Sequence, residues 1–213
     1  MNDENEKKNT FPSKETTDKW FHFLYLVIWP FFNLVRPINA IGKENIPDGP
    51  VVICPNHSTI GDPFYVCFGF GRKYPMRAIA KMAILKLPFI GWILGKAGVF
   101  GVDRGSADVK AVKTSLRYLK EGSKLLIFPE GTRVREGMEV EPKTGAVLFA
   151  TRTNTPILPV YVPRKKKLFR FNTIVIGKPY YPEFEGRRPS TEELKTITDD
   201  LMVRIYKLGE GRE

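Results

Sequence analysis

Residues 50–62 read Pro-Val-Val-Ile-Cys-Pro-Asn-His-Ser-Thr-Ile-Gly-Asp, an apolar run of strand length that leads into a polar loop. The run at 50–54 is rich in β-branched residues and is typical of a buried strand. Further runs of this length occur at residues 77–80, 99–102, 124–128, 157–162 and 173–176. Helical patterns separate several of them. Alternating strands and helices predict an α/β fold, here a single domain with a mixed, largely parallel sheet flanked by helices.

Three segments have the pattern of helices. In the first, Ser106 can cap a helix whose apolar face recurs from residue 109 to residue 119, and Gly122 can end it. The second covers residues 144–152. In the third, Ser190 and Glu193 form a capping box before an amphipathic pattern that extends to residue 208. We therefore expect an amphipathic helix after the last strand.

Size and charge narrow the class of protein. The chain has 213 residues, enough for one domain with a sizeable core, and its 34 basic and 23 acidic residues give a net charge of +11. Such a charge favours anionic partners. Nucleic acid is the weaker candidate, since the aromatic residues gather in one segment instead of alternating with Lys and Arg. The densest basic run, residues 164–167, is typical of a solvated loop, which would add attraction to an anionic membrane surface.

His57 is one of two histidines, and Asp62 follows it after a glycine. This spacing suits a carboxylate that folds back onto the imidazole, fixes the ring tautomer and leaves the other nitrogen free to accept a proton. The pattern favours a general base that acts on a hydroxyl. Two alternatives stay open: a purely structural histidine, and a zinc site with Cys54, which has ligand-like spacing. Cys54 and Cys67 have apolar neighbours and indicate buried thiols in a reducing compartment.

Other polar residues follow predicted strands in the same way. Arg104 follows the run at 99–102, and Glu130 to Arg133 follow the run at 124–128. Functional sites in α/β sheets collect in loops beyond the carboxyl ends of strands. We therefore expect these residues to meet His57 at one edge of the sheet.

Four motifs in this order resemble the glycerolipid acyltransferase family, and most closely its 1-acylglycerol-3-phosphate acyltransferase branch. They are His-x4-Asp at residues 57–62, Gly-Val-Phe-Gly-Val-Asp-Arg at 98–104, Phe-Pro-Glu-Gly-Thr-Arg at 128–133 and Ile-Leu-Pro-Val at 157–160. The hexapeptide is the most specific of them, and the resemblance covers residues 41–182. One departure is that Ser58 directly follows the histidine, where the family often has a variable residue and then serine. The departure is harmless, because neither residue 58 nor residue 59 has to supply the general base.

The resemblance implies the transfer of a fatty acyl group from a thioester to the sn-2 hydroxyl of lysophosphatidic acid, which gives phosphatidic acid for phospholipid biosynthesis. His57 would be the base and Asp62 would orient it. The donor would be acyl-CoA or acyl-acyl-carrier protein, with no cofactor and no metal. Alternatives are glycerol 3-phosphate or another lysophospholipid as acceptor, and a non-catalytic peripheral lipid-binding module. The expected substrate-binding residues are Arg104, Glu130, Gly131, Thr132, Arg133 and Lys143.

Two apolar segments suggest contact with lipid. Residues 1–19 are polar and predict disorder, and residues 20–36 are aromatic, broken at Pro30 and shorter than the roughly 20 apolar residues that span a bilayer. We expect two short helical pieces in the interface of the cell membrane, on its cytoplasmic face, with packing onto the protein's own core as the alternative. Residues 37–213 would form the acyltransferase domain. Residues 82–94 are the second segment, which the resemblance links to the acyl chain.

Overall fold

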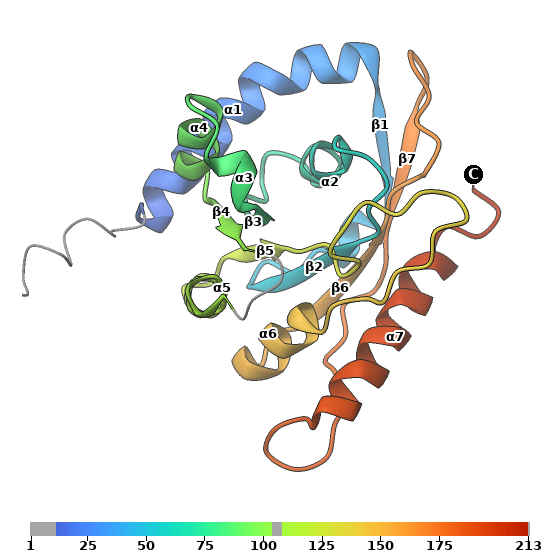
Figure 1. Ribbon diagram of the computed structural model, residues 1–213. Helices are drawn as coiled ribbons and strands as arrows, with labels where there is room; N and C mark the ends of the chain where they lie inside the picture. Colours follow the sequence, from blue (N-terminus) through green and yellow to red (C-terminus); the bar gives the residue numbers. More distant parts are fainter. Residues whose placement is uncertain (1–11, 104–107, 213) are drawn as a thin grey trace, which may run out of the picture.

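The computed structural model describes residues 12–103 and 108–212. Its centre is a seven-stranded sheet with the order β1-β7-β6-β2-β5-β3-β4 (Figure 1). Every neighbouring pair is parallel except β6 and β7, which are antiparallel. The strands are β1 (Ile38–Ile41), β2 (Val51–Pro55), β3 (Met76–Lys81), β4 (Val99–Val102), β5 (Lys124–Leu126), β6 (Ile157–Tyr161) and β7 (Asn172–Ile176).

The strand β2 lies at the centre because both of its faces are apolar. Val51 and Ile53 pack on one side of the sheet with α1 (Lys14–Val35) and α2 (Asp62–Phe70). Val52 and Cys54 pack on the other side with α5 (Val109–Lys120), α6 (Gly145–Thr153) and α7 (Thr191–Lys207). A strand that is covered on both faces appears in sequence as a continuous apolar run. The predicted α/β fold with a mixed, largely parallel sheet is thus confirmed, and each predicted strand is present to within two residues at either end.

Helices cover both faces of this sheet (Figure 1). The predicted capping box is present, because the Ser190 hydroxyl accepts from the Glu193 amide and the Glu193 carboxylate accepts from the Ser190 amide. The first predicted helix is also present, but its cap is Asp108, which accepts from the Ala111 amide at 2.9 Å. Ser106 lies outside the described residues. The helices are α1 (Lys14–Val35), α2 (Asp62–Phe70), α3 (Met82–Leu85), α4 (Ile90–Lys96), α5 (Val109–Lys120), α6 (Gly145–Thr153) and α7 (Thr191–Lys207), with a 3₁₀ turn, η2 (Lys43–Asn45).

The helix α1 differs from the expectation for the first 36 residues. The Ser13 hydroxyl caps it by accepting from the Thr16 amide at 3.2 Å, so residues 14–19 are helical and not disordered, while residues 1–11 lie outside the described range. The helix is also one piece that continues through Pro30. Packing explains both corrections, since Phe21 and Phe32 join the core between α1 and the sheet. Tertiary burial of an apolar face commonly outweighs a local helix breaker.

The opposite face of α1 stays exposed. The side chains of Phe23, Leu26, Phe31 and Leu34 point away from the core and are accessible to solvent. Among residues 12–103 and 108–212, no helix combines the length and the apolar character that crossing a bilayer requires. One face of α1 thus packs on the core, which agrees with the alternative prediction for this segment. The other face presents apolar side chains to solvent.

Candidate active site

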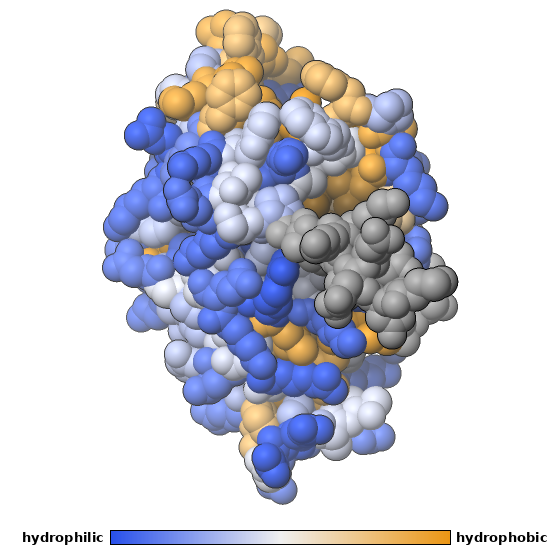
Figure 2. Space-filling model, turned by 90° about the vertical axis from the view of Figure 1, so that its left-hand side faces the viewer, coloured by the Kyte–Doolittle hydropathy of each residue, from blue (hydrophilic) through white to orange (hydrophobic). Residues whose placement is uncertain are grey.

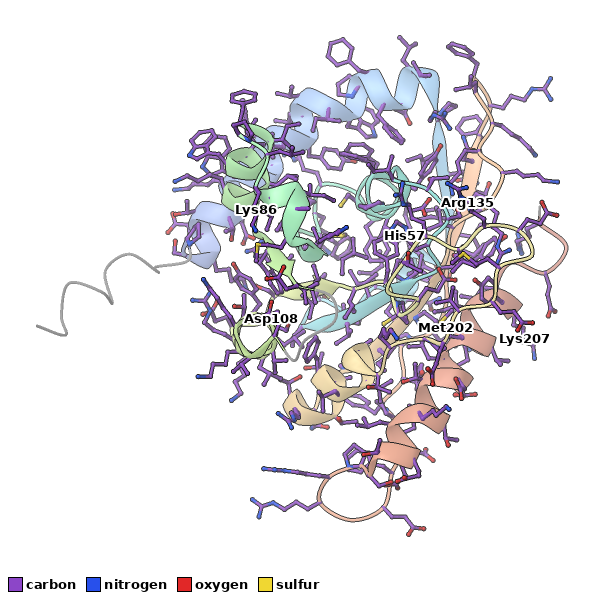
Figure 3. The ribbon with its side chains drawn as sticks, viewed as in Figure 1. His57, Lys86, Asp108, Arg135, Met202 and Lys207 are labelled. Carbon is purple, nitrogen blue, oxygen red and sulfur yellow. The ribbon has the colours of Figure 1, made fainter. Side chains whose placement is uncertain are left out.

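His57 and Asp62 form a hydrogen-bonded pair just beyond the carboxyl end of β2. The imidazole Nδ1 lies 2.9 Å from the carboxylate of Asp62. This residue is the first of α2 and is fully buried. Asn56 fixes the start of the loop, since its side-chain amide exchanges two hydrogen bonds with the backbone of Val162 at the end of β6. Figure 3 shows His57 between α2 and the loop that follows β5. The predicted pairing of this histidine with Asp62 is confirmed by the geometry.

The Asp62 carboxylate is held from several directions. It accepts from the backbone amides of Ser58 at 2.6 Å and Thr59 at 2.7 Å, and from the Thr59 hydroxyl at 2.8 Å. Burial alone would raise the pKa of Asp62, but the hydrogen bond from His57 and the charge of Lys166 outweigh it and lower that pKa to about 2. Asp62 is therefore ionised at neutral pH and can only accept. Nδ1 of His57 must carry the proton, which leaves Nε2 as the acceptor.

Lys166 is the partner of this pair that the sequence analysis missed. Its Nζ lies 2.6 Å from Asp62 Oδ1 and 2.6 Å from the Ser58 hydroxyl, and only 4% of its side chain is exposed. The prediction of a solvated loop for residues 164–167 is wrong for this residue. A run of basic residues gives no periodic signal for the one that turns inward. Burial lowers the pKa of Lys166, and the carboxylate of Asp62 opposes that effect.

Glu130 holds the backbone of the loop that carries His57. Its Oε2 accepts from the His57 amide at 2.6 Å, and its Oε1 accepts from the Tyr206 hydroxyl of α7. The Val134 amide donates to the His57 carbonyl at 2.8 Å. The loop after β5 thus bonds both the backbone amide and the backbone carbonyl of His57. Phe128 stacks on the imidazole with 4.1 Å between ring centroids. In this structure the two Glu130 oxygens bond the His57 amide and the Tyr206 hydroxyl, so its contacts are with the loop and α7, and its predicted role in substrate binding stays a prediction.

The other predicted substrate residues lie at the rim. Gly131 has φ of +65°, and a Cβ placed there would come within 2.9 Å of Lys143 Cγ, so these two residues are in contact. Arg133 and Lys143 are exposed and Thr132 is half-buried. Arg133 has no hydrogen-bonded or ion-paired partner among the residues that the structure describes. Arg104 lies outside the described residues. The structure thus places Gly131 in contact with Lys143 on the loop that bonds the His57 backbone, and it leaves the Arg133 and Lys143 side chains exposed.

An apolar cavity of about 420 Å³ lies on the β4 side of the molecule. It is formed by α3, α4, β4 and α5, and the residues that line it include Met82, Leu85, Trp92, Gly95, Phe100 and Tyr118. It therefore uses the second apolar segment that the sequence analysis singled out at 82–94. None of these lining residues belongs to the histidine site, so the cavity is a separate feature of the molecule.

Comparisons with known proteins show the family and the fold of the chain. A family model described as Acyltransferase matches residues 37–163. The 1-acyl-sn-glycerol-3-phosphate acyltransferase of Bacillus subtilis is 33% identical over 177 residues, which cover 80% of this chain and 87% of that protein. The enzyme of the same name from Borreliella burgdorferi is 37% identical, with 80% and 70% covered. The crystal structure of the 1-acyl-sn-glycerophosphate (LPA) acyltransferase PlsC from Thermotoga maritima shares the fold, with a TM-score of 0.63, 24% identity, and 100% and 86% covered.

Proposed function

Since this chain belongs to the Acyltransferase family, we propose that it transfers a fatty acyl group from a thioester to the sn-2 hydroxyl of lysophosphatidic acid, giving phosphatidic acid. The family and the enzyme class predicted from the four motifs are thereby confirmed. The names of the relatives from Bacillus subtilis and Borreliella burgdorferi support the acceptor. The observation that carries the chemistry is the His57–Asp62 pair, in which the bond of Nδ1 to the carboxylate leaves Nε2 as the proton acceptor.

In the proposed reaction His57 acts as general base. Nε2 accepts the proton of the acceptor hydroxyl while that oxygen attacks the carbonyl carbon of the thioester. The tetrahedral intermediate then collapses, the carbon–sulfur bond breaks, and the departing thiolate takes the proton from the imidazolium. Asp62 stays ionised throughout, since its pKa is about 2, and its negative charge stabilises the imidazolium. A positioned base of this kind contributes about 10²–10⁴-fold to the rate.

Direct transfer fits the state of the two cysteines. Burial raises the pKa of the Cys54 thiol, and it raises that of the Cys67 thiol to about 12. The thiolate is the nucleophilic form, so neither residue is activated at neutral pH. A base that activates the acceptor makes an acyl-enzyme unnecessary. We accordingly propose a single displacement without cofactor or metal.

The rim residues suit a phosphomonoester. The Arg133 guanidinium can form paired hydrogen bonds with phosphate oxygens, and the Lys143 ammonium adds a second positive charge. Gly131 lets the backbone approach the ligand, because it carries no side chain. The cavity beside β4 has the apolar lining that a fatty acyl chain requires. These features support an anionic acceptor and a long-chain donor, either acyl-CoA or acyl-acyl-carrier protein.

We propose that the enzyme is peripheral and acts at the cytoplasmic face of the cell membrane. Figure 2 shows hydrophobic side chains gathered at the end of the molecule where α1 runs in Figure 1. The exposed members of this group on α1 include Phe31 and Leu34, and the segment of α3 and α4 adds Phe89 and Trp92. An apolar helix face of this kind lies in the headgroup region of a bilayer. The enzyme would then lie at the depth of the lipid headgroups, where the phosphate of a membrane-embedded acceptor also lies.

The test is a matrix of donors and acceptors with purified protein. Acyl-CoA and acyl-acyl-carrier protein would each be combined with lysophosphatidic acid, glycerol 3-phosphate and lysophosphatidylcholine. His57→Ala should lower the turnover of lysophosphatidic acid by about 10²–10⁴-fold. His22→Ala is the matched control, since the His22 ring lies on α1 and bonds the Arg72 carbonyl instead of a residue of the site, and it should retain activity.

Near-normal turnover by His57→Ala would refute the mechanism. Faster turnover of glycerol 3-phosphate would overturn the acceptor and keep the chemistry. A folded wild-type protein that binds lipid and acylates nothing would instead support the lipid-binding module.

A further inference from the structure

The loop that joins β6 to β7 exposes three large apolar side chains. Phe169 and Phe171 are 71% and 70% exposed, and Leu168 is more than half exposed. Isolated exposed apolar residues are common, but a contiguous group of this kind marks a surface that binds something. The His57 chemistry makes no use of these rings.

The exposure is fixed by the structure of the loop. Asn172 is buried, and its side-chain amide accepts from the Lys167 amide at 2.7 Å and donates to the carbonyls of Lys167 at 2.9 Å and Arg170 at 3.0 Å. Phe169 itself has φ of +56°, in the left-handed region that non-glycine residues rarely adopt. Strained residues persist where the surroundings hold them. The hydrogen bonds of Asn172 therefore fix the loop in a conformation that exposes the two phenylalanine rings.

The loop is joined to the carboxyl end of α1. The Phe169 amide donates to the Val35 carbonyl, and the Asn172 amide donates to the Pro37 carbonyl, each at 2.8 Å. The last turns of α1 expose Phe31 and Leu34. Figure 1 shows the tip of the loop beside the corner where α1 leads into β1. The rings of the loop are thus continuous with the exposed apolar face of α1.

The charges of the loop complement an anionic surface. Lys165, Lys167 and Arg170 are exposed. The two lysines precede the apolar side chains, Arg170 lies between the two phenylalanines, and residues 163–172 contain no acidic residue. Rings that enter the headgroup region with cations beside them are typical of segments that bind anionic lipid. An acidic protein would satisfy the charges equally well. Continuity with α1 favours the bilayer, because both surfaces then meet one plane.

We propose that residues 164–171 are a second membrane contact, which inserts Leu168, Phe169 and Phe171 into an anionic leaflet beside α1. This inference rests on the proposed function, in which the acceptor is a lipid of the membrane. Lys166, two residues before Leu168, is the residue that pairs with Asp62. The same short loop thus reaches both the lipid surface and the catalytic pair, and it places His57 next to the headgroups from which the acceptor comes.

Co-sedimentation with vesicles tests the contact without requiring catalysis. The variant Phe169→Asn with Phe171→Ser removes both rings, and Asn tolerates the left-handed backbone at 169. On vesicles of phosphatidylcholine with phosphatidylglycerol we expect its partition coefficient to fall about tenfold or more. Val203→Ser is the matched control, because Val203 is an equally exposed apolar residue on α7, and it should bind as wild type.

The charges are tested separately. Replacing Lys165, Lys167 and Arg170 by Gln should weaken binding to the same vesicles by about fivefold per charge. Binding to pure phosphatidylcholine should change little. The control replaces Arg187 and Arg188 by Gln, since these exposed residues lie on the loop before α7, at the far end of the molecule. Equal losses per removed charge in the two sets would mean that net charge alone acts, and would overturn the contact.

Activity assays distinguish the remaining outcomes. The ring variant should keep its turnover of a short-chain lysophosphatidic acid dissolved as monomers and lose turnover on vesicles. Sedimentation equal to wild type would refute the proposal. If the ring variant sediments like wild type and loses activity only with acyl-acyl-carrier protein as donor, the loop would instead bind an acidic protein. If the wild-type protein acylated no acceptor, the proposed function would fail, while the sedimentation result would still decide the membrane contact.

Discussion

The replacement of Lys166 by Met tests whether this lysine sustains the His57–Asp62 pair. Met has nearly the same length and no charge, so it fills the site and leaves Asp62 without its ion-pair partner at 2.6 Å. Removing one member of a buried ion pair costs about 3–5 kcal/mol when the other charge is left unpaired. Asp62 keeps its hydrogen bonds from Ser58, Thr59 and His57. We therefore expect a loss of about 2 kcal/mol in the free energy of unfolding at neutral pH.

The pH dependence of this loss has a definite sign. The pKa of Asp62 is about 2 in the folded protein, below the value of about 3.9 for an unfolded Asp. A carboxyl group whose pKa is lowered by folding stabilises the protein above pH 4, and that contribution is lost as the pH falls toward 2. Without Lys166 the pKa of Asp62 rises. The variant should therefore lose both stability and activity at a higher pH than the wild type.

Urea denaturation and pH–rate profiles measure these effects. Turnover of a short-chain, dissolved acceptor should fall by about 10- to 100-fold, since His57 loses part of its support. The acid limb of the profile should move to higher pH. Lys120→Met, an exposed lysine on α5, is the control and should leave stability, turnover and profile unchanged. A Lys166→Met protein with wild-type stability and an unmoved acid limb would refute this account of the site.

Three further predictions concern other parts of the chain. Gly131→Ala should lower the free energy of unfolding by about 1–2 kcal/mol in urea denaturation, because φ at this residue is +65°. Gly95→Leu should fold as well as wild type, since a Cβ there meets no atom within 4 Å, and it should shift the chain-length optimum of kcat/KM toward shorter acyl donors by filling the cavity beside β4. Asp18→Asn should cost about 3–5 kcal/mol in the same denaturation assay, because it removes the carboxylate 2.6 Å from the buried guanidinium of Arg77. A denaturation midpoint equal to wild type for the first or the third, or an unchanged optimum for the second, would contradict the geometry.

The parts of the fold that were predicted correctly have local signals. The central strands have continuous apolar runs, and α7 has its capping box and amphipathic period within a few residues. The strand β1 was missed because it lies at the edge of the sheet and alternates half-buried and exposed residues. The helix α2 was missed because it is apolar around most of its circumference, so its residues show no helical period.

The site divides in the same way. His57 and Asp62 are five residues apart, so their spacing alone suggested the pair. Lys166 and Tyr206 come from distant parts of the chain, and only the parallel register of the strands and the docking of α7 bring them to the loop. Pro30 shows the converse effect, because a local helix breaker was overridden by packing that the sequence pattern does not display.

The contacts of Lys166 and Tyr206 also determine when the site is completed during synthesis. The ribosome delivers His57 and Asp62 early, then Glu130, and only much later the lysine that pairs with the carboxylate and the tyrosine that bonds Glu130. A nascent chain that has emerged as far as β5 contains His57 but neither of these supporting residues. The complete site is therefore a property of a chain synthesised through α7, and a shorter nascent chain holds His57 and Asp62 without these two contacts.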